Sequence, residues 1–236
     1  ARNRASRSTT MCAAQVAHPH GAVIAWTAQS PLDATLATPL TAAARKRASY
    51  EDVLAADPRV VAEVIDGVLY TQPRPALGHA LVASELTYRL IGPFRHGRGG
   101  PGGWHILAEP ELHLGPEPDI LVPALASWRT SRMPRVPNRA FETLAPDWVA
   151  EILSPSTSRV DRSMKLPVYL RERVPHVWLL DPQAMTIEVL RLDGGSYRLL
   201  GVHTDEDRAR LEPFDEIELD IATLWLEDDE TTPSGG

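Results

Sequence analysis

The chain has 236 residues, of which 43% are hydrophobic and 23% charged, and its formal net charge is −7. These fractions are those of an ordinary globular protein and differ from those of disordered or membrane proteins. The length is sufficient for one medium-sized domain with its own core. A single cysteine, Cys12, excludes a disulfide framework and a cysteine-based zinc site, so a cytoplasmic location is expected.

The charge is distributed unevenly along the chain. Residues 1–50 contain six basic residues and one acidic residue, so they carry +5 and the remainder carries −12. Residues 203–236 contain twelve acidic residues against two arginines, which gives −10. A domain with this balance has no general attraction for nucleic acid, so DNA binding would depend on a local basic patch.

Composition divides the chain into three regions. Residues 1–40 mix Ala, Thr, Ser, Pro and Arg without periodicity, and we expect a disordered basic arm that is either a solvated tail or a contact for a partner. Residues 41–226 carry the patterns of a single domain. Residues 227–236 have the composition of a solvated acidic tail.

The first part of the domain is expected to contain a short helix, a hairpin and a longer helix. Ser49 is a favourable N-cap for the short helix. Residues 60–65 and 68–70 flank Asp66-Gly67, a dipeptide favoured in two-residue hairpin turns. Residues 79–91 repeat apolar side chains at helical spacing.

Strands and an arginine-rich loop are expected next. Residues 104–114 alternate as one strand would, and His105 and His113 are expected on its surface. Residues 127–138 read as an irregular loop without acidic residues. Its basic residues are Arg129, Arg132 and Arg135. The loop is either flexible and solvated or a contact for phosphate groups.

The run Trp148–Leu153 is apolar except for Glu151 and ends at a Ser-Pro turn, which predicts a buried strand with one carboxylate. Burial of an unpaired carboxylate costs several kcal/mol, so Glu151 should meet a metal, a cation or a proton. A second strand begins with an acid, at Pro118-Asp119. Together the two acidic strands suggest a metal-dependent site.

The remaining segments predict the fold class. A helix is expected over residues 161–173, starting near Ser158. Residues 177–181, 186–191 and 196–202 are expected to form an antiparallel meander. Strands around two helices indicate an α+β (α/β-like) fold with a mixed sheet.

Several short strings in this chain resemble one known family. They are Glu63-Val64-Ile65-Asp66-Gly67, His79, Pro118-Asp119, Glu151-Ile152-Leu153-Ser154-Pro155-Ser156-Thr157, Asp161, Lys165, Tyr169, Val174-Pro175 and Trp178-Leu179-Leu180-Asp181-Pro182. Through them, residues 45–225 resemble the Uma-two family of restriction endonucleases, within the PD-(D/E)XK nuclease superfamily. The resemblance implies a restriction-endonuclease-like core, a mixed sheet flanked by helices, with a divalent metal at the sheet end and extra antiparallel strands.

The resemblance also implies roles for individual residues. Asp119 matches the Asp of the superfamily motif and Glu151 its second acid, with the carbonyl of Ile152 as a third ligand to Mg²⁺ or Mn²⁺. The superfamily's lysine ordinarily stands two residues after the second acid, but that position is Leu153. Lys165 in the following helix is the expected replacement.

A further acid is expected to complete the site. The candidates are Glu63, Glu85 and Glu109, of which Glu63 is preferred. Each assignment has a structural alternative. Glu63 beside the turn can stabilise the hairpin, and Asp119 at the start of its strand can be a turn or cap residue. Glu151 can form a structural ion pair with an Arg, and Lys165 can be a solvated helix residue. His79 is expected to contact backbone or to cap its helix.

The leading hypothesis is a Mg²⁺-dependent endonuclease that acts on DNA through Asp119, Glu151 and Lys165. The resemblance implies a homodimer as well. The alternative is a catalytically inactive nuclease-like module for nucleic-acid or protein interaction, favoured by Leu153 and by the acidic surface. Retention of both acids favours the enzyme, because clustered carboxylates would repel phosphate in a simple binding module.

Overall fold

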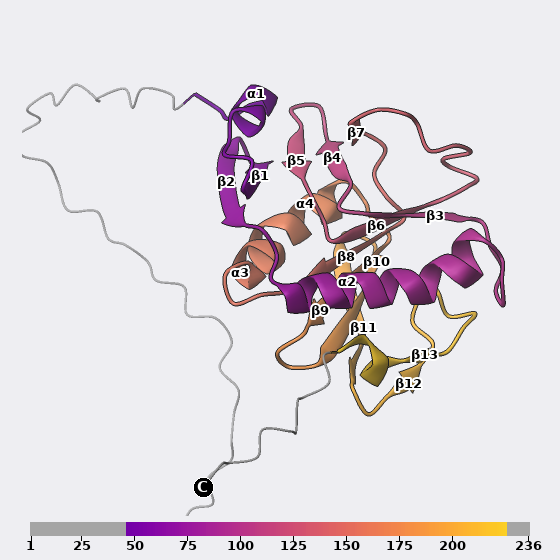
Figure 1. The fold of residues 1–236 in the computed structure, drawn as a ribbon. Helices are drawn as coiled ribbons and strands as arrows, with labels where there is room; N and C mark the ends of the chain where they lie inside the picture. Colours follow the sequence, from indigo (N-terminus) through magenta and orange to yellow (C-terminus); the bar gives the residue numbers. More distant parts are fainter. Residues whose placement is uncertain (1–45, 226–236) are drawn as a thin grey trace, which may run out of the picture. The chain divides into compact units, whose positions relative to one another are not determined.

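The computed structural model describes residues 46–225 (Figure 1). The expected arm, residues 1–40, and the expected acidic tail, residues 227–236, lie outside the described residues. No helix within residues 46–225 is long and apolar enough to cross a membrane.

The secondary structure alternates short strands with few helices. The elements of the first half are α1 (Tyr50–Leu54), β1 (Val60–Ile65), β2 (Val68–Pro73), α2 (Leu77–Leu90), η1 (Ile91–Arg95), β3 (Trp104–Ala108), β4 (Glu111–Leu114), β5 (Asp119–Leu121), β6 (Leu125–Arg129) and β7 (Phe141–Glu142). The elements of the second half are β8 (Trp148–Ile152), α3 (Ser158–Val160), η2 (Asp161–Lys165), α4 (Leu166–Arg171), β9 (His176–Asp181), β10 (Thr186–Asp193), β11 (Ser196–Thr204), β12 (Arg208–Ala209), β13 (Leu219–Asp220) and η3 (Ile221–Leu224).

Two main sheets of mixed direction form the core of the fold. Their strand orders are β2-β1-β5-β4-β7 and β11-β10-β9-β8-β6-β3, and β12 pairs with β13. Strands β4 and β7 run parallel in the first sheet, and β8 and β9 run parallel in the second. The predicted α+β fold with mixed sheet pairing is confirmed.

Strand alternation sends the side chains of β8 to two different cores. Ala150 and Ile152 belong to the apolar cluster that α2 covers through residues such as Leu86. Val149 belongs to a second cluster, which packs against α4 and the five-stranded sheet. Glu151 follows Val149 by two residues, so it points toward this second layer.

A helical crossover joins the parallel strands β8 and β9. The chain leaves β8 through the Ser-Pro turn, where Thr157 donates its backbone N–H to Ser154 Oγ at 3.2 Å. The segment from α3 through η2 to α4 then returns along the sheet before β9 begins. Parallel neighbours require such a crossover, and this one carries Lys165 back to the end of the sheet beside Glu151.

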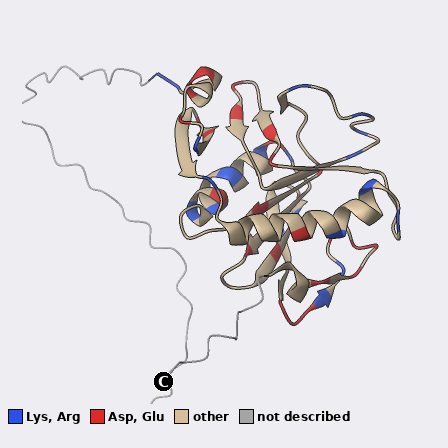
Figure 2. Cartoon of the chain, viewed as in Figure 1, with Lys and Arg blue, Asp and Glu red and all other residues tan. Residues whose placement is uncertain are grey.

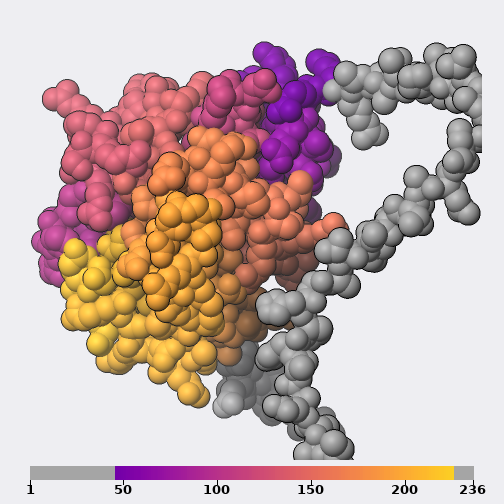
Figure 3. Space-filling model, turned by 180° about the vertical axis from the view of Figure 1, so that it is seen from behind, coloured from indigo at the N-terminus to yellow at the C-terminus, as the bar shows by residue number. Residues whose placement is uncertain are grey.

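The local predictions for the first helix, the hairpin and the meander are confirmed. The N-cap Ser49 and Asp52 form a capping box, and Asp52 Oδ2 accepts the Ser49 N–H at 2.8 Å. Strands β1 and β2 pair around Asp66-Gly67. Strands β9, β10 and β11 pair antiparallel in sequence order. From behind, the orange to yellow residues that include this meander cover the middle and lower part of the surface (Figure 3).

Three predictions for the middle of the chain are wrong. Residues 104–114 form two strands, β3 and β4, in different sheets, and the chain turns at Glu109 with a φ of 46°. His105 and His113 are buried, with exposed fractions of 5% and 7%, because both sheets are covered on these sides. The ring of His113 stacks on Phe141, with ring centroids 3.8 Å apart. The expected loop also starts later, since β6 extends to Arg129.

An aromatic cluster stabilises the face of the six-stranded sheet that α2 covers. The Phe214 ring centroid lies 4.6 Å from that of Phe94, 5.0 Å from those of Trp104 and Trp148, and 5.8 Å from that of Trp178. Phe214 is fully buried. This one side chain therefore joins the C-terminal segment to β3, β8 and β9.

Replacement of Phe214 by Ala should lower the free energy of unfolding by about 3–5 kcal/mol, because it removes a large buried side chain and leaves a cavity. Urea denaturation measures the change. Leu199→Ala is the control: Leu199 is 50% exposed on β11, and its loss should change the value by less than about 0.5 kcal/mol. Equal effects of the two substitutions would contradict the assigned core.

Candidate functional site

Glu151 is a buried carboxylate at the end of β8, with 4% of its surface exposed. Its Oε1 accepts a hydrogen bond from the hydroxyl of Tyr169 on α4, at 2.5 Å. The ammonium of Lys165 lies 3.5 Å from both carboxyl oxygens. The buried acid that the sequence predicts thus meets a cation.

Lys165 lies at the centre of three carboxylates. Its Nζ is 3.0 Å from Glu63 Oε1 and 3.2 Å from Asp161 Oδ1, in addition to the contact with Glu151. The side chain is 3% exposed. Asp161 and Lys165 are the ends of η2, a π-helical turn, and such turns occur frequently at functional sites.

Glu63 on β1 holds the lysine from the side of the five-stranded sheet. Its Oε1 accepts the backbone N–H of Val122 at 2.8 Å, and its Oε2 accepts the amide of Gln72 at 3.0 Å. Glu63 is fully buried and does not line the adjacent pocket. Both carboxyl oxygens of Glu63 therefore accept hydrogen bonds from neighbouring groups. Glu63, the preferred candidate for the further acid, thus holds Lys165 in position.

Three carboxylates around one ammonium leave an excess of negative charge in a buried site. Burial raises the pKa of Glu151 to about 8, against the effect of Lys165, and Asp161 and Glu63 raise it further. Burial lowers the pKa of Lys165, but Glu151, Glu63 and Asp161 outweigh it and raise that pKa. The lysine therefore stays charged, and Glu151 is the group that takes up a proton.

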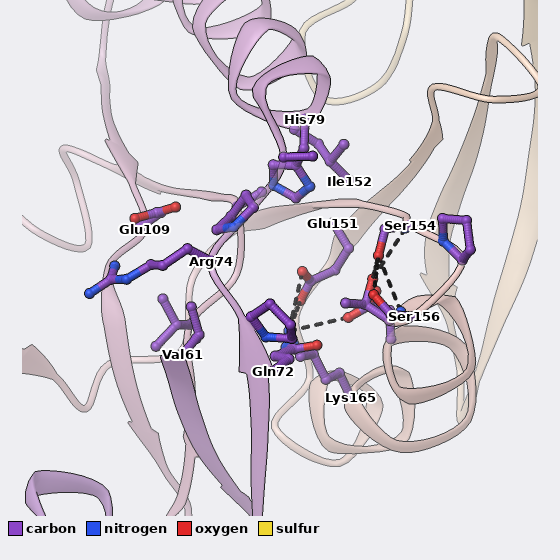
Figure 4. A pocket seen from close by; sticks show the side chains of 18 residues that line it. Val61, Gln72, Arg74, His79, Glu109, Glu151, Ile152, Ser154, Ser156 and Lys165 are labelled. Atoms are coloured by element: carbon purple, nitrogen blue, oxygen red, sulfur yellow. Dashed lines mark hydrogen bonds and ion pairs between the residues drawn. The ribbon is translucent and has the colours of Figure 1, made fainter. Parts of the chain in front are cut away.

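A pocket of about 330 Å³ opens beside this cluster. Glu151 and Lys165 lie on one side of it, and Glu109 and Arg74 lie across from them (Figure 4). Ile152, the expected source of a carbonyl ligand, also lines the pocket. The volume is that of a small-molecule or single-group site, in which a phosphodiester group would face both acids and cations.

Asp119 does not join this site. Its Oδ1 accepts the backbone N–H of Asp66 at 2.6 Å, and its Oδ2 accepts a hydrogen bond from Arg171 at 2.5 Å. Asp119 is not among the residues that line the pocket. Asp119 and Glu151 were expected on neighbouring strands, but β5 and β8 belong to different sheets.

Of the other candidate residues, Glu109 and His79 line the pocket and Glu85 does not. Glu85 is on α2 and pairs with Arg89 at 3.8 Å, outside the pocket. Glu109 is an exposed pocket residue. His79 lines the pocket and does not cap α2, whose N-cap is Ala76. Burial lowers the pKa of His79.

The arginine loop lies away from the pocket. Strand β6 runs from Leu125, next to the pocket, to Arg129, a separation of about 13 Å at the usual rise per residue. The guanidinium of Arg129 lies 4.2 Å from the ring centroid of Trp104, and Arg132 pairs with Asp147 at 3.0 Å. Figure 2 shows the basic residues along the loop between β6 and β7. Their contact with DNA stays a prediction.

Sequence reasoning assigned no role to Tyr169, Gln72 and Arg74. A signal existed for Tyr169, which lies four residues after Lys165 and hence on the same helical face. A signal also existed for Gln72, because the hairpin register places it opposite Val61, one diagonal step from Glu63. Arg74 follows β2 in a loop and had no such pattern.

Comparisons with known proteins agree with this fold. A family model named Uma2 and described as "Putative restriction endonuclease" matches residues 48–222. Among solved structures, the chain is similar to "a putative nuclease belonging to DUF820 from Anabaena variabilis ATCC 29413", with a TM-score of 0.56 and 24% identity. The match covers 70% of this chain and 89% of that chain, and at this identity it shows the fold alone. No match was found among curated proteins.

The raised pKa of Glu151 should make the stability of the protein pH-dependent. The folded pKa of about 8 exceeds the ordinary value of 4.5, so the stabilisation is fully present below about pH 4.5 and is lost as the pH rises through 8. We expect Glu151→Gln to flatten the fall in unfolding free energy over this range. Urea denaturation with a chelator present measures it, and Glu188→Gln, on the surface, is the matched control. Parallel curves for native protein and Glu151→Gln would contradict the prediction.

Arg171 should stabilise the buried carboxylate of Asp119. We expect Arg171→Met to lower the free energy of unfolding by about 1–3 kcal/mol, because Asp119 then loses its charged donor. Addition of Asp119→Asn should restore part of this loss, since the amide carries no charge to compensate. Thermal or urea unfolding of the two single variants and the double variant gives the coupling. Strict additivity would refute the proposed pairing.

Proposed function

We propose, since the chain belongs to the Uma2 family matched over residues 48–222, that its pocket hydrolyses phosphodiester bonds of DNA with the help of Mg²⁺ or Mn²⁺. The observation that carries this proposal is the buried ammonium of Lys165, held by three carboxylates beside an open pocket. Apolar side chains would fill such a space at least as stably, so a charged cluster next to a pocket favours a functional role.

The oxygen atoms that line the pocket are of the chemical type that a divalent metal binds. They are hard donors, which Mg²⁺ prefers, and come from the carboxylates of Glu151 and Asp161 and the backbone of Ile152. Within residues 46–225, no group of three or more His, Cys, Asp or Glu side chains is arranged to hold a metal ion. The set therefore suits an ion that retains most of its water and takes one or two carboxylates. When bound, such an ion neutralises phosphate charge and acidifies water.

The chain's own residues supply positioning and charge. Lys165 is the cation that stabilises negative charge as it develops on the phosphodiester, and its burial strengthens that interaction. Glu63 and Tyr169 hold Lys165 and Glu151 in place through the contacts described above. They are positioning residues, because neither lines the pocket.

Arg74 is the cation best placed for the nucleic acid on the open side of the pocket. The domain as a whole is acidic, so affinity for DNA should depend on a few such contacts and should fall steeply with salt. Contacts by Arg129, Arg132 and Arg135 remain a separate prediction, and so does a homodimer.

Cleavage of supercoiled plasmid DNA tests the proposal. Native protein should nick or linearise it with Mg²⁺ or Mn²⁺ and lose this activity with a chelator. Glu151→Gln should reduce the rate by at least about 100-fold, because an amide cannot lose a proton to become the carboxylate that a divalent ion binds. Glu188→Gln, which alters a surface ion pair with Arg162, should retain the native rate. A folded native protein without cleavage, or undiminished cleavage by Glu151→Gln, would refute the assignment.

A second candidate function is supported by two observations. Leu153 stands where the superfamily's lysine is expected, and Asp119 is engaged by Arg171 outside the pocket. This arrangement favours a nuclease-like module that binds nucleic acid or protein without chemistry. This candidate would be supported if native protein and Glu151→Gln both bind DNA at low salt and neither cleaves it.

A further inference from the structure

Two basic segments meet at the end of β3 and β6 that lies away from the pocket. One is the glycine-rich segment, residues 92–103, which leads from η1 into β3, and the other is the arginine loop, residues 127–138. Thr130 donates its backbone N–H to the carbonyl of Gly103 at 2.9 Å. In the strand register, Trp104 pairs with Arg129. The two segments are therefore neighbours, although they are far apart in the sequence.

Positive charge is concentrated on these two segments. Neither contains an acidic residue, and together they carry Arg95, Arg98, Arg129, Arg132 and Arg135. Asp147 pairs with Arg132 at 3.0 Å, so five arginines against one carboxylate leave +4. Residues 46–225 as a whole contain twenty basic and twenty-six acidic residues, which gives −6. Figure 2 shows blue on both segments, at the end of α2 away from the pocket.

Most of these guanidinium groups have no carboxylate partner. Arg95, Arg98 and Arg135 are exposed, and within residues 46–225 their side chains form no hydrogen bond or ion pair. Arg129 stacks on the ring of Trp104, a contact that leaves its charge uncompensated. Clustered like charges repel one another, and a bound polyanion relieves this repulsion. The arrangement therefore favours an anionic partner.

The surroundings define where such a partner would lie. Gly99 has a φ of 77° and open space where a side chain would stand, so the backbone there is accessible to a phosphate group. On the side of η1, Phe214 packs against Phe94, and the exposed acids Asp215 and Glu216 follow Phe214. These acids repel phosphate, so the polyanion extends from the glycine-rich segment toward the arginine loop.

We propose that the glycine-rich segment and the arginine loop together bind the phosphate backbone of double-stranded DNA outside the pocket. The choice of DNA as the polyanion rests on the proposed function. Strand β6 places Arg129 about 13 Å from the end of the strand that adjoins the pocket, so the two segments contact other phosphates than the one at Lys165. Such contacts position a protein on DNA and carry no sequence information.

Fluorescence anisotropy of a labelled DNA duplex, with a chelator present to prevent cleavage, tests the inference. Arg98→Gln and Arg135→Gln, one from each segment, should each weaken binding about five- to tenfold at about 0.1 M salt, because each removes about one phosphate contact. The slope of log K against log salt concentration should fall by about 1 in each variant. The losses should be equal on two duplexes of unrelated sequence.

Arg198→Gln is the matched control. Arg198 is an exposed arginine of β11, and within residues 46–225 its side chain has no ion pair either. This variant should bind DNA as the native protein does. All three substitutions replace exposed side chains, and thermal unfolding verifies that each variant is folded.

The inference is overturned if native protein does not bind the duplex at low salt, or if both Arg98→Gln and Arg135→Gln bind within about twofold of the native protein. An equal loss in Arg198→Gln would overturn it as well, because the effect would then be one of net charge. A loss confined to one of the two segments would contradict a surface that needs both.

Plasmid cleavage in parallel separates this inference from the proposed function. Weaker binding by Arg98→Gln and Arg135→Gln, with no cleavage by native protein, would support the binding surface and refute the nuclease. Cleavage by native protein, with unchanged binding in both variants, would refute the surface and leave the nuclease standing.

Discussion

The ion pairs between Lys165 and three buried carboxylates constrain the rest of this structure. Glu63 comes from the five-stranded sheet, Glu151 from the six-stranded sheet, and Asp161 from the crossover that also carries the lysine. A buried charge without its partner is strongly destabilising, so these elements are held together by the need to satisfy one ammonium. The pocket exists where the two sheets and the crossover meet.

The lysine comes from η2, and Leu153, directly after β8, belongs to the core. Leu153 is 4% exposed and packs in the cluster that includes Val168 and Tyr169 of α4. Lys46 and Lys165 are the lysines of the whole chain. A lysine is a compact point charge, which suits a position among three carboxylates better than the planar fork of an arginine.

Local patterns predicted most of the fold and the segments that carry Glu63, Glu151 and Lys165. The hairpin with Glu63, the strand with Glu151 and the helix with Lys165 each follow from a turn dipeptide or a hydrophobic period. The place of Asp119 could not be predicted, because it depends on which strands become neighbours across two sheets. Alternation over residues 104–114 gave no sign of the turn at Glu109, since the sheet changes there while the pattern continues.

The protonation state of Lys165 tests the central claim most directly. With two lysines in the chain, ¹⁵N-labelled lysine gives one signal from the site and one from Lys46. A charged ammonium held by Glu151, Glu63 and Asp161 has a raised pKa, so the account predicts that the signal of Lys165 exchanges slowly and remains that of an ammonium at alkaline pH. A Lys165 signal that loses its proton at alkaline pH, or that exchanges as fast as the signal of the exposed Lys46, would contradict it.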